Sequence, residues 1–276
     1  MNEPRSLRLP LGATIGLAIV VINLLAAILA PLIAPFGEAD LVGNVWAPPS
    51  AEFWLGLDNL GRDMFSRLLY GARLTISVAL AITMLSFAIG IVTGFLAAIA
   101  GGWIDMLLSR AVDAIMAIPV LIFALIILSV MGTSLPVLIL TIAVLDSTRV
   151  FRLCRAVGRD INVMDFVEVA RLRGEGLWWV MRHELLPNAL PSLVTEFGLR
   201  FCFAFLFIAT LSFLGLGIQP PLADWGGMVR DNAQAIGFGG IAPLVPAAAI
   251  GVLTIGVNLV VDWILSRHSR PHGEGA

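Results

Sequence analysis

The sequence contains no lysine, and charged residues make up only 13% of its 276 positions. All 17 basic residues are arginines. A phosphate-binding loop of the form GxxxxGK[ST] requires a lysine, so this chain cannot carry one, and a partner must hydrolyse any ATP that its function consumes. The formal net charge of −2 gives no indication of nucleic-acid binding.

Cysteine and histidine are also scarce, with two and three copies. Cys154 lies at the end of one expected membrane span and Cys202 lies inside another, where no structural disulfide is expected. The stretch HELLP begins like a zinc-protease helix at His183, but Pro187 stands where the second histidine is needed. His268 and His272 belong to a polar tail. We therefore expect no catalytic residue, cofactor or metal ion in this chain.

Long apolar runs are what the sequence has in abundance. Hydrophobic residues make up 59% of the chain, and its mean hydropathy is +0.95. A bilayer core of about 30 Å is crossed by roughly 20 apolar helical residues. The runs are too continuous for barrel strands, and hydrocarbon requires internally paired backbones, so we expect an all-α polytopic protein. The six expected transmembrane helices are Leu11–Ala34, Leu74–Ala100, Ala111–Met131, Leu135–Val150, Leu190–Leu214 and Ile241–Leu265.

Arginine placement predicts the orientation, because cytoplasmic flanks are enriched in positive charge. If both termini are cytoplasmic, most arginines fall on that side, Arg200 lies within a span, and the opposite side receives Arg62, Arg67, Arg73 and Arg230. The two outer segments, 35–71 and 215–240, are too small for a soluble domain with its own core. Substrate capture is therefore expected to belong to another protein.

The spans divide the chain into three expected parts. Residues 1–72 form an N-terminal span with an extracytoplasmic segment, and residues 73–268 form the core. Residues 269–276 form a polar C-terminal tail. The core contains a cytoplasmic loop at about residues 160–188. Leucine, phenylalanine and charged residues in 58–73 also suit an amphipathic helix at the outer membrane face, although simple anchoring of the second span explains them nearly as well.

The cytoplasmic loop is charged and amphipathic. Its spacing predicts a short helix from Asp165 to Arg173. The apolar face of this helix is Phe166, Val169 and Ala170, and the polar face is Asp165, Glu168 and Arg171. Gly174 should break the helix, and a second amphipathic run should end at Pro187. Composition alone favours a helix pair lying against membrane lipid.

The same loop resembles that of binding-protein-dependent ABC importer permeases. Their pattern is Glu-Ala-Ala, three residues, Gly, nine residues, Ile, one residue and Leu-Pro. The matching residues here are Glu168, Val169, Ala170, Gly174, Leu186 and Pro187. Two positions depart from the pattern: Val169 replaces an alanine, and Glu184 places a charge where the family packs an isoleucine.

Three further stretches narrow the resemblance to C-type subunits of dipeptide and oligopeptide permeases. They are WLGLDNLGRDMFSRLLYGAR (54–73), SRAVDAIMAIPVLIFAL (109–125) and LSFLGLGIQPPLADWGGMVRD (211–231). The resemblance covers nearly the whole chain and implies a type I ABC importer permease fold in a bacterial inner membrane. It also implies a second homologous permease subunit, two ATPase subunits that bind ATP and Mg, and a periplasmic or lipid-anchored binding protein. The loop would dock on an ATPase.

Charges inside the expected spans are candidates for the transport pathway, because each costs about 2.5–3.5 kcal/mol at the bilayer centre unless it is paired or faces a cavity. Glu196 and Arg200 are spaced to pair on one helix face. Asp146 has Arg149 one turn away, which predicts a local pair or a contact with the second permease. Arg110 and Asp113 are also spaced to pair.

Substrate identity is open at this point. Short peptides are the first expectation, and nickel chelates, opines or oligosaccharides carried by the same machinery are the alternative. A self-contained membrane channel is a different class of function. A channel has no need of an ATPase dock, so the loop at 160–188 distinguishes the two classes.

Overall fold

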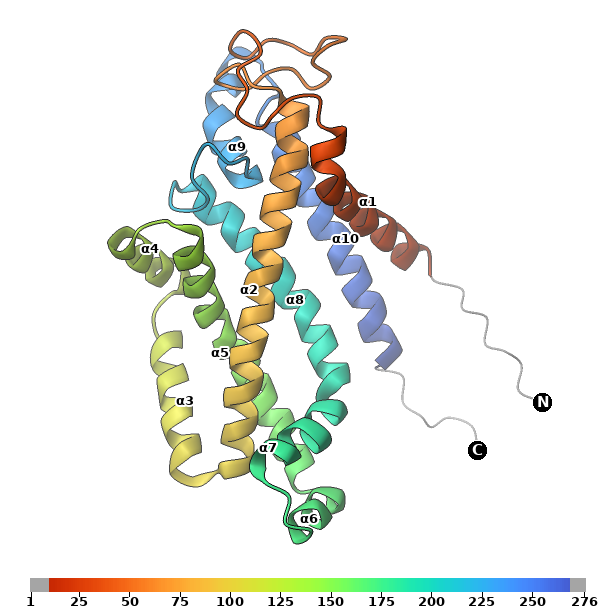
Figure 1. Ribbon diagram of the computed structural model, residues 1–276, viewed down its shortest axis with the longest axis vertical. Coiled ribbons are helices and arrows are strands. Elements are labelled where there is room, and N and C mark those ends of the chain that lie inside the picture. The colour runs from red at the N-terminus through yellow and green to blue at the C-terminus, as the bar shows by residue number, and fades with distance from the viewer. Residues whose placement is uncertain (1–9, 269–276) are drawn as a thin grey trace, which may run out of the picture. The chain divides into compact units, whose positions relative to one another are not determined.

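The computed structural model describes residues 10–268, and this part of the chain is helical apart from loops and two isolated antiparallel bridges (Figure 1). The expected all-α class is therefore confirmed. Arg5, Arg8, Arg270, His272 and the tail at 269–276 lie outside the described residues.

The helices are as follows: α1 (Leu11–Ile33), α2 (Met64–Ala100), α3 (Gly102–Met116), α4 (Val120–Met131), α5 (Leu135–Asn162), α6 (Asp165–Leu172), α7 (Leu177–Val180), a π turn (Met181–Leu185), α8 (Leu186–Phe213), α9 (Trp225–Asn232), a 3₁₀ turn (Ala233–Phe238) and α10 (Leu244–His268). Each expected span corresponds to one of these helices or to a pair of them. The differences lie in where the helices begin, bend and end.

Within the described residues, four helices are long and apolar enough to cross a membrane: α1, α2, the run Leu177–Phe213, and α10. α3 and α4 together would make a fifth if they are counted as one span. That span would be broken, because the two helices meet at an angle of 86°. The expected single helix over Ala111–Met131 is therefore wrong. Pro119 precedes α4 and has no N–H to continue the α3 ladder, which explains the break.

The expected fourth span is the first part of α5. This helix continues past Val150 to Asn162. It carries three charged residues in its middle turns: Asp146, Arg149 and Arg152. These charges distinguish it from the purely apolar spans. Asp146 and Arg152 have ion-pair partners within the second unit.

The chain forms two compact units. The first combines the described parts of Met1–Leu74 and Pro221–Ala276, and the second is Thr75–Pro220. In the first unit α1 packs along α10. A Cβ on Gly16 would lie 2.7 Å from Cβ of Leu259 and 2.8 Å from the carbonyl oxygen of Gly256, so glycine is what permits this close helix contact.

The expected outer segment 35–71 and residues 221–240 of the other one fold together within the first unit. Trp46 Nε1 and the Asn59 amide both donate to Oδ1 of Asn232, and Trp225 Nε1 donates to the Leu68 carbonyl. The stretch 58–73, which suited an interfacial helix, forms no helix of its own, because its residues from Met64 onward are the start of α2. Its charges are buried: Arg62 Nε lies 2.7 Å and Arg67 Nε 3.2 Å from Oδ2 of Asp58.

The second unit is a bundle of α5, α8 and the part of α2 after Thr75, with α3 and α4 alongside α5. Its core consists of Phe87, Phe95, Val150, Cys154, Ile161, Val167, Val180, Met181, Leu185, Ala189 and Leu193. Residues of the loop at 160–188, such as Val167 and Leu185, belong to this same core. The loop is thus a continuation of the bundle's packing.

Candidate functional site

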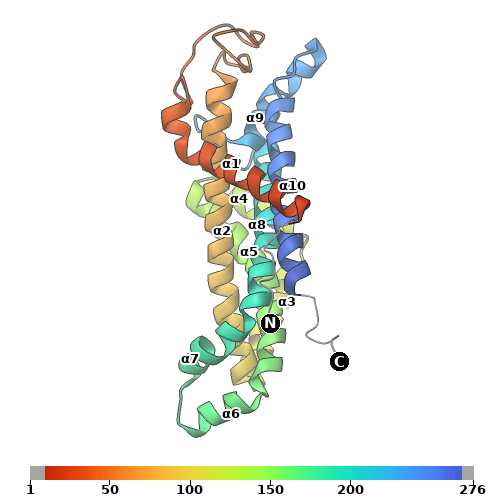
Figure 2. The ribbon, with the colours of Figure 1, turned by 90° about the vertical axis from the view of Figure 1, so that its right-hand side faces the viewer.

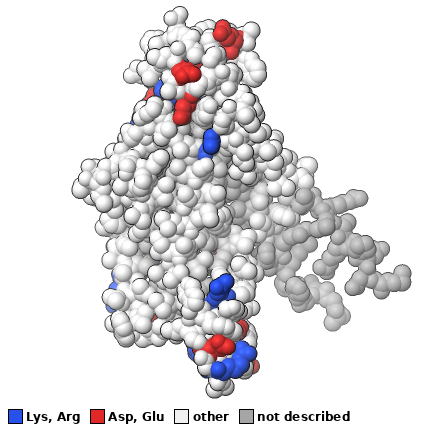
Figure 3. Space-filling model, viewed as in Figure 1, with Lys and Arg blue, Asp and Glu red and all other residues white. Residues whose placement is uncertain are grey.

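The loop between α5 and α8 forms a short helix at one end of the second unit. Figures 1 and 2 both show α6 and α7 at the end of the bundle of α2, α5 and α8. The helix predicted from Asp165 is confirmed as α6, which ends at Leu172. Figure 3 shows charged atoms of both signs gathered at this end.

Gly174 makes the turn after α6. Its φ is +86°, in the left-handed region that favours glycine. The Gly174 amide donates to the Arg171 carbonyl at 2.9 Å, and the Glu175 amide donates to the Ala170 carbonyl at 3.2 Å. These two bonds make the Schellman arrangement, which satisfies the last carbonyls of a helix. The predicted helix break at Gly174 is confirmed, and the two hydrogen bonds define the conformation of the turn.

The two faces of α6 differ from the prediction at one residue. Ala170, which was expected beside Phe166 and Val169, is buried together with Val167 against the bundle. Phe166 and Val169 are exposed, at 41% and 51%, and Leu172 is 81% exposed. Packing against the bundle buries the face that carries the smaller Ala170. Within residues 10–268, the three larger apolar side chains of α6 are therefore left exposed.

The polar residues of α6 are exposed as expected, but their pairing is different. Arg171 donates to Oδ1 of Asn162 at 2.5 Å and makes no ion pair with Glu168. This bond joins the end of α5 to the end of α6. Among the described residues, Asp165 and Glu168 have no ion-pair partner and lie exposed in the first turn of α6.

The prediction that the second run ends at Pro187 is wrong. Together α7, the π turn and α8 form one helical run from Leu177 to Phe213. In the π turn the Leu186 amide bonds the Met181 carbonyl five residues earlier. This wider turn moves the preceding carbonyls away from the ring of Pro187, which would clash in a regular helix. No break in the helix therefore separates the second half of the loop from α8.

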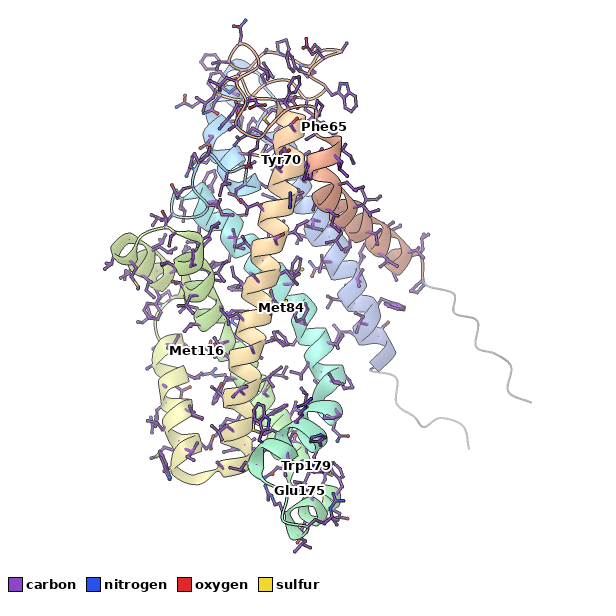
Figure 4. The ribbon with its side chains drawn as sticks, in the orientation of Figure 1. Phe65, Tyr70, Met84, Met116, Glu175 and Trp179 are labelled. Carbon is purple, nitrogen blue, oxygen red and sulfur yellow. The ribbon has the colours of Figure 1, made fainter. Side chains whose placement is uncertain are left out.

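Aromatic contacts brace the second half of the loop. The Trp179 ring stacks on His183 with centroids 4.7 Å apart, and the Arg173 guanidinium lies 5.7 Å from the Trp179 ring centroid. Figure 4 labels Trp179, which lies in α7, and Glu175, which precedes it. Glu184, the departure from the family's isoleucine, is half-buried. Leu186 is half-buried and Pro187 is exposed.

A second candidate site is a polar cluster within the bundle. Asp146 on α5 is only 1% exposed. Its Oδ1 lies 3.2 Å from Nη1 of Arg200 on α8, and its Oδ2 accepts from Ser86 on α2 at 3.4 Å. Arg200 also pairs with Glu196, at 2.8 Å, as the spacing predicted. Arg200 is thus shared by two acids, and the cluster keeps one net negative charge.

Arg149 does not form the predicted local pair with Asp146. Its guanidinium instead lies 5.3 Å from the centroid of the Phe203 ring on α8. Beside it is a cavity of about 140 Å³, at the bend between α3 and α4. The lining residues are Ile115, Met116, Ile118, Pro119, Val120, Leu145, Asp146, Thr148, Arg149 and Phe203.

Ion pairs between α3 and α5 were not predicted. Asp105 contacts both Arg155 and Arg159, with Nη2 of Arg155 2.8 Å from Oδ2 of Asp105. The expected pairing of Arg110 with Asp113 is replaced by one between Arg152 and Asp113, at 2.8 Å. Partners some 50 residues apart leave no local signal in the sequence.

A family model matches residues 90–270 of this chain: the binding-protein-dependent transport system inner membrane component. The match includes α5, the loop and α8.

Three relatives match most of the chain. The dipeptide transport system permease protein DppC of Alkalihalophilus pseudofirmus is 35% identical over 91% of this chain and 83% of its own. The protein of the same name from Haemophilus influenzae is 32% identical over 92% and 88%. The glutathione transport system permease protein GsiD of Pectobacterium atrosepticum is 31% identical over 78% and 72%.

A solved structure shares the fold. It is the crystal structure of an amino acid ABC transporter with histidines, with a TM-score of 0.55 and 20% identity over 73% of this chain and 94% of that chain.

Proposed function

Because the chain belongs to the family of binding-protein-dependent transport system inner membrane components, we propose that it forms half of the translocation pathway of an ATP-driven importer of short peptides. The chain is a membrane-spanning permease component with the fold of type I ABC importer permeases. The second half of the pathway is a homologous permease subunit, and the complex lies in a bacterial inner membrane with both termini cytoplasmic.

The observation that carries the coupling part of the proposal is the outer face of α6. Phe166, Val169 and Leu172 are exposed on a helix whose other face is packed into the core. Lipid can cover such side chains, but Asp165 and Glu168 stand among them and are unpaired acids. A protein surface with a cleft accommodates both kinds of residue. We assign this surface to an ATPase subunit.

The loop is built to transmit force in both chain directions. Towards α5, Arg171 bonds Asn162, and towards α8 the helix continues through the π turn. Closure of two ATPase subunits on ATP and Mg would displace α6, and α5 and α8 would move with it as one packed body. ATP and Mg are bound by those subunits. A channel would not need this arrangement.

The substrate assignment rests on the relatives. Those named above are described as permeases for dipeptides or glutathione, which are peptides. A periplasmic or lipid-anchored binding protein would deliver the peptide to the outer side of the complex. Nickel chelates, opines and oligosaccharides remain outcomes of the test.

The test is uptake by the whole transporter in proteoliposomes, with this chain, the second permease, both ATPases and the binding protein. We expect ATP-dependent accumulation of a tritiated dipeptide, and none of a nickel chelate, an opine or an oligosaccharide. Accumulation of one of those compounds in place of the dipeptide would overturn the substrate assignment. Flux through this chain alone, without ATP, would overturn the importer assignment in favour of a channel.

A further inference from the structure

The cavity beside Arg149 combines an apolar wall with one guanidinium that makes no ion pair within residues 10–268. Ile115, Met116, Ile118 and Pro119 come from the bend between α3 and α4, and Phe203 comes from α8. The charged lining residues are Asp146 and Arg149, both on α5. A small apolar space with one or two fixed polar groups is the usual composition of a ligand site.

The carboxylate of Asp146 already has partners within the bundle. Both of its carboxylate oxygens have partners, Arg200 and Ser86, and the side chain is fully buried. Arg200 is in turn shared with Glu196. The two acids share the single charge of Arg200, so the cluster keeps one net negative charge close to Arg149, but neither oxygen of Asp146 lacks a partner.

Arg149 is different. Within the described part of the chain it makes no ion pair, and it is exposed. The Phe203 ring lies under its guanidinium, an arrangement that holds the side chain in place while leaving its N–H donors free. A cation in a membrane-spanning helix is expected to have a partner or a transport role. A planar guanidinium is suited to a carboxylate, which it can bind through two N–H groups.

The volume limits what part of a ligand can enter. At about 140 Å³ the cavity is smaller than the roughly 300–1,000 Å³ of sites that enclose a drug-sized ligand. One end of a peptide of any length fits this volume. Every linear peptide with an unmodified end carries a C-terminal carboxylate, regardless of its side chains.

We propose that Arg149 binds the C-terminal carboxylate of the transported peptide at this cavity. The inference rests on the proposed function, since it supposes that the substrate is a peptide. It explains how one pathway can accept peptides of different sequence, because the contact uses the group that they share. The bend at Pro119 and the Phe203 ring position the cavity wall around that end of the peptide.

Photolabelling in the complete transporter tests this. p-Benzoylphenylalanine replaces Met116, which lines the cavity at the end of α3 (Figure 4), and in a second preparation it replaces Ile118. Proteoliposomes with the binding protein, ATP and a tritiated dipeptide are irradiated during uptake. We expect labelling of this chain that requires ATP, and a loss of at least about tenfold in Arg149→Gln, as for one charge-assisted hydrogen bond.

Two variants serve as controls. Arg149→Lys keeps the charge and should restore part of the labelling. Arg152→Gln removes an exposed arginine one turn away, which pairs with Asp113 outside the cavity, and should label like the parent.

The inference is overturned if neither position is labelled while uptake proceeds, or if Arg149→Gln is labelled like the parent. It is also overturned if Arg149→Gln loses the second permease subunit on purification, because the arginine then pairs with an acid of that subunit. Failure of the unaltered transporter to accumulate any dipeptide would instead reject the proposed function.

Discussion

Nη1 of Arg200 lies 3.2 Å from Oδ1 of Asp146, and this contact joins α8 to α5 across 54 residues of sequence. The Asp146 side chain is fully buried and that of Arg200 is 12% exposed. Ion pairs in such surroundings are favourable only while both partners are present, because a single buried charge loses its hydration without compensation.

Arg200→Met is therefore expected to destabilise the second unit by about 3 kcal/mol, the usual scale for removing one partner of a buried pair. The double variant with Asp146→Leu removes the orphaned carboxylate and should recover much of this loss. Thermal unfolding of the purified transporter in detergent measures both. Equal melting temperatures for Arg200→Met and the parent would contradict the assignment of this pair.

Adjacent residues on α6 should give opposite phenotypes. Phe166→Ala shortens an exposed side chain, so it should leave the melting temperature unchanged and reduce the amount of ATPase that copurifies. Val167→Ala removes buried methyl groups, so it should lower stability by about 1–2 kcal/mol and retain the ATPase. Glu168→Ala should resemble Phe166→Ala in a milder form. If both Phe166→Ala and Val167→Ala changed the melting temperature and neither reduced the amount of copurified ATPase, α6 would have no docking role.

The ion pairs between α3 and α5 should differ in strength. Asp105 contacts Arg155 and Arg159 and its side chain is 10% exposed, whereas the side chains of Asp113 and Arg152 are 57% and 54% exposed. Asp105→Ala should lower the melting temperature clearly, while Asp113→Ala should cost at most about 1 kcal/mol. A thermal shift series on the two variants decides this, and a larger effect from Asp113→Ala would contradict the ranking.

Close packing of α1 on α10 makes a further prediction about the first unit. Gly16→Val places a Cβ in the space of Leu259 and Gly256 and should force the helices apart. Gly12→Ala is the matched control, because its Cβ would meet only Leu259, at 3.8 Å. Protease sensitivity of purified transporter should rise for Gly16→Val alone. Equal sensitivity in the two variants would show that the contact is not tight.

The sequence predicted the features that depend on local pattern. The apolar runs predicted where α1 and α10 begin to within a few residues of the observed starts, Leu11 and Leu244. Helical spacing predicted the position of α6. The glycine at 174 indicated a turn because few other residues adopt a positive φ. The roles assigned to the loop residues stay predictions.

Other features depend on packing that no local pattern contains. Ala170 was placed on the wrong face because an eight-residue helix offers two apolar faces, and the contact with the bundle decides between them. Pro187 was expected to end a helix, yet the π turn before it makes room for its ring. The partners of Asp146 and Asp105 are distant in sequence, so periodicity could not identify them.

The central claim is that the loop at 160–188 is the ATPase dock, and Gly174→Val tests it most directly. Gly174 has φ +86° with open space around its Cβ position, whereas the equally open Gly176 has φ −77°. Valine at 174 is strained in the turn, so the spans should insert normally while the orientation of α6 is lost. Gly176→Ala, which needs no unusual backbone, is the control.

The measurement is the amount of ATPase that copurifies with this chain, together with ATP-dependent dipeptide uptake. The account predicts normal membrane levels of Gly174→Val, loss of ATPase and no uptake, with Gly176→Ala close to the parent. Stoichiometric ATPase and full uptake in Gly174→Val would contradict the account and leave the loop as a helix pair lying against lipid.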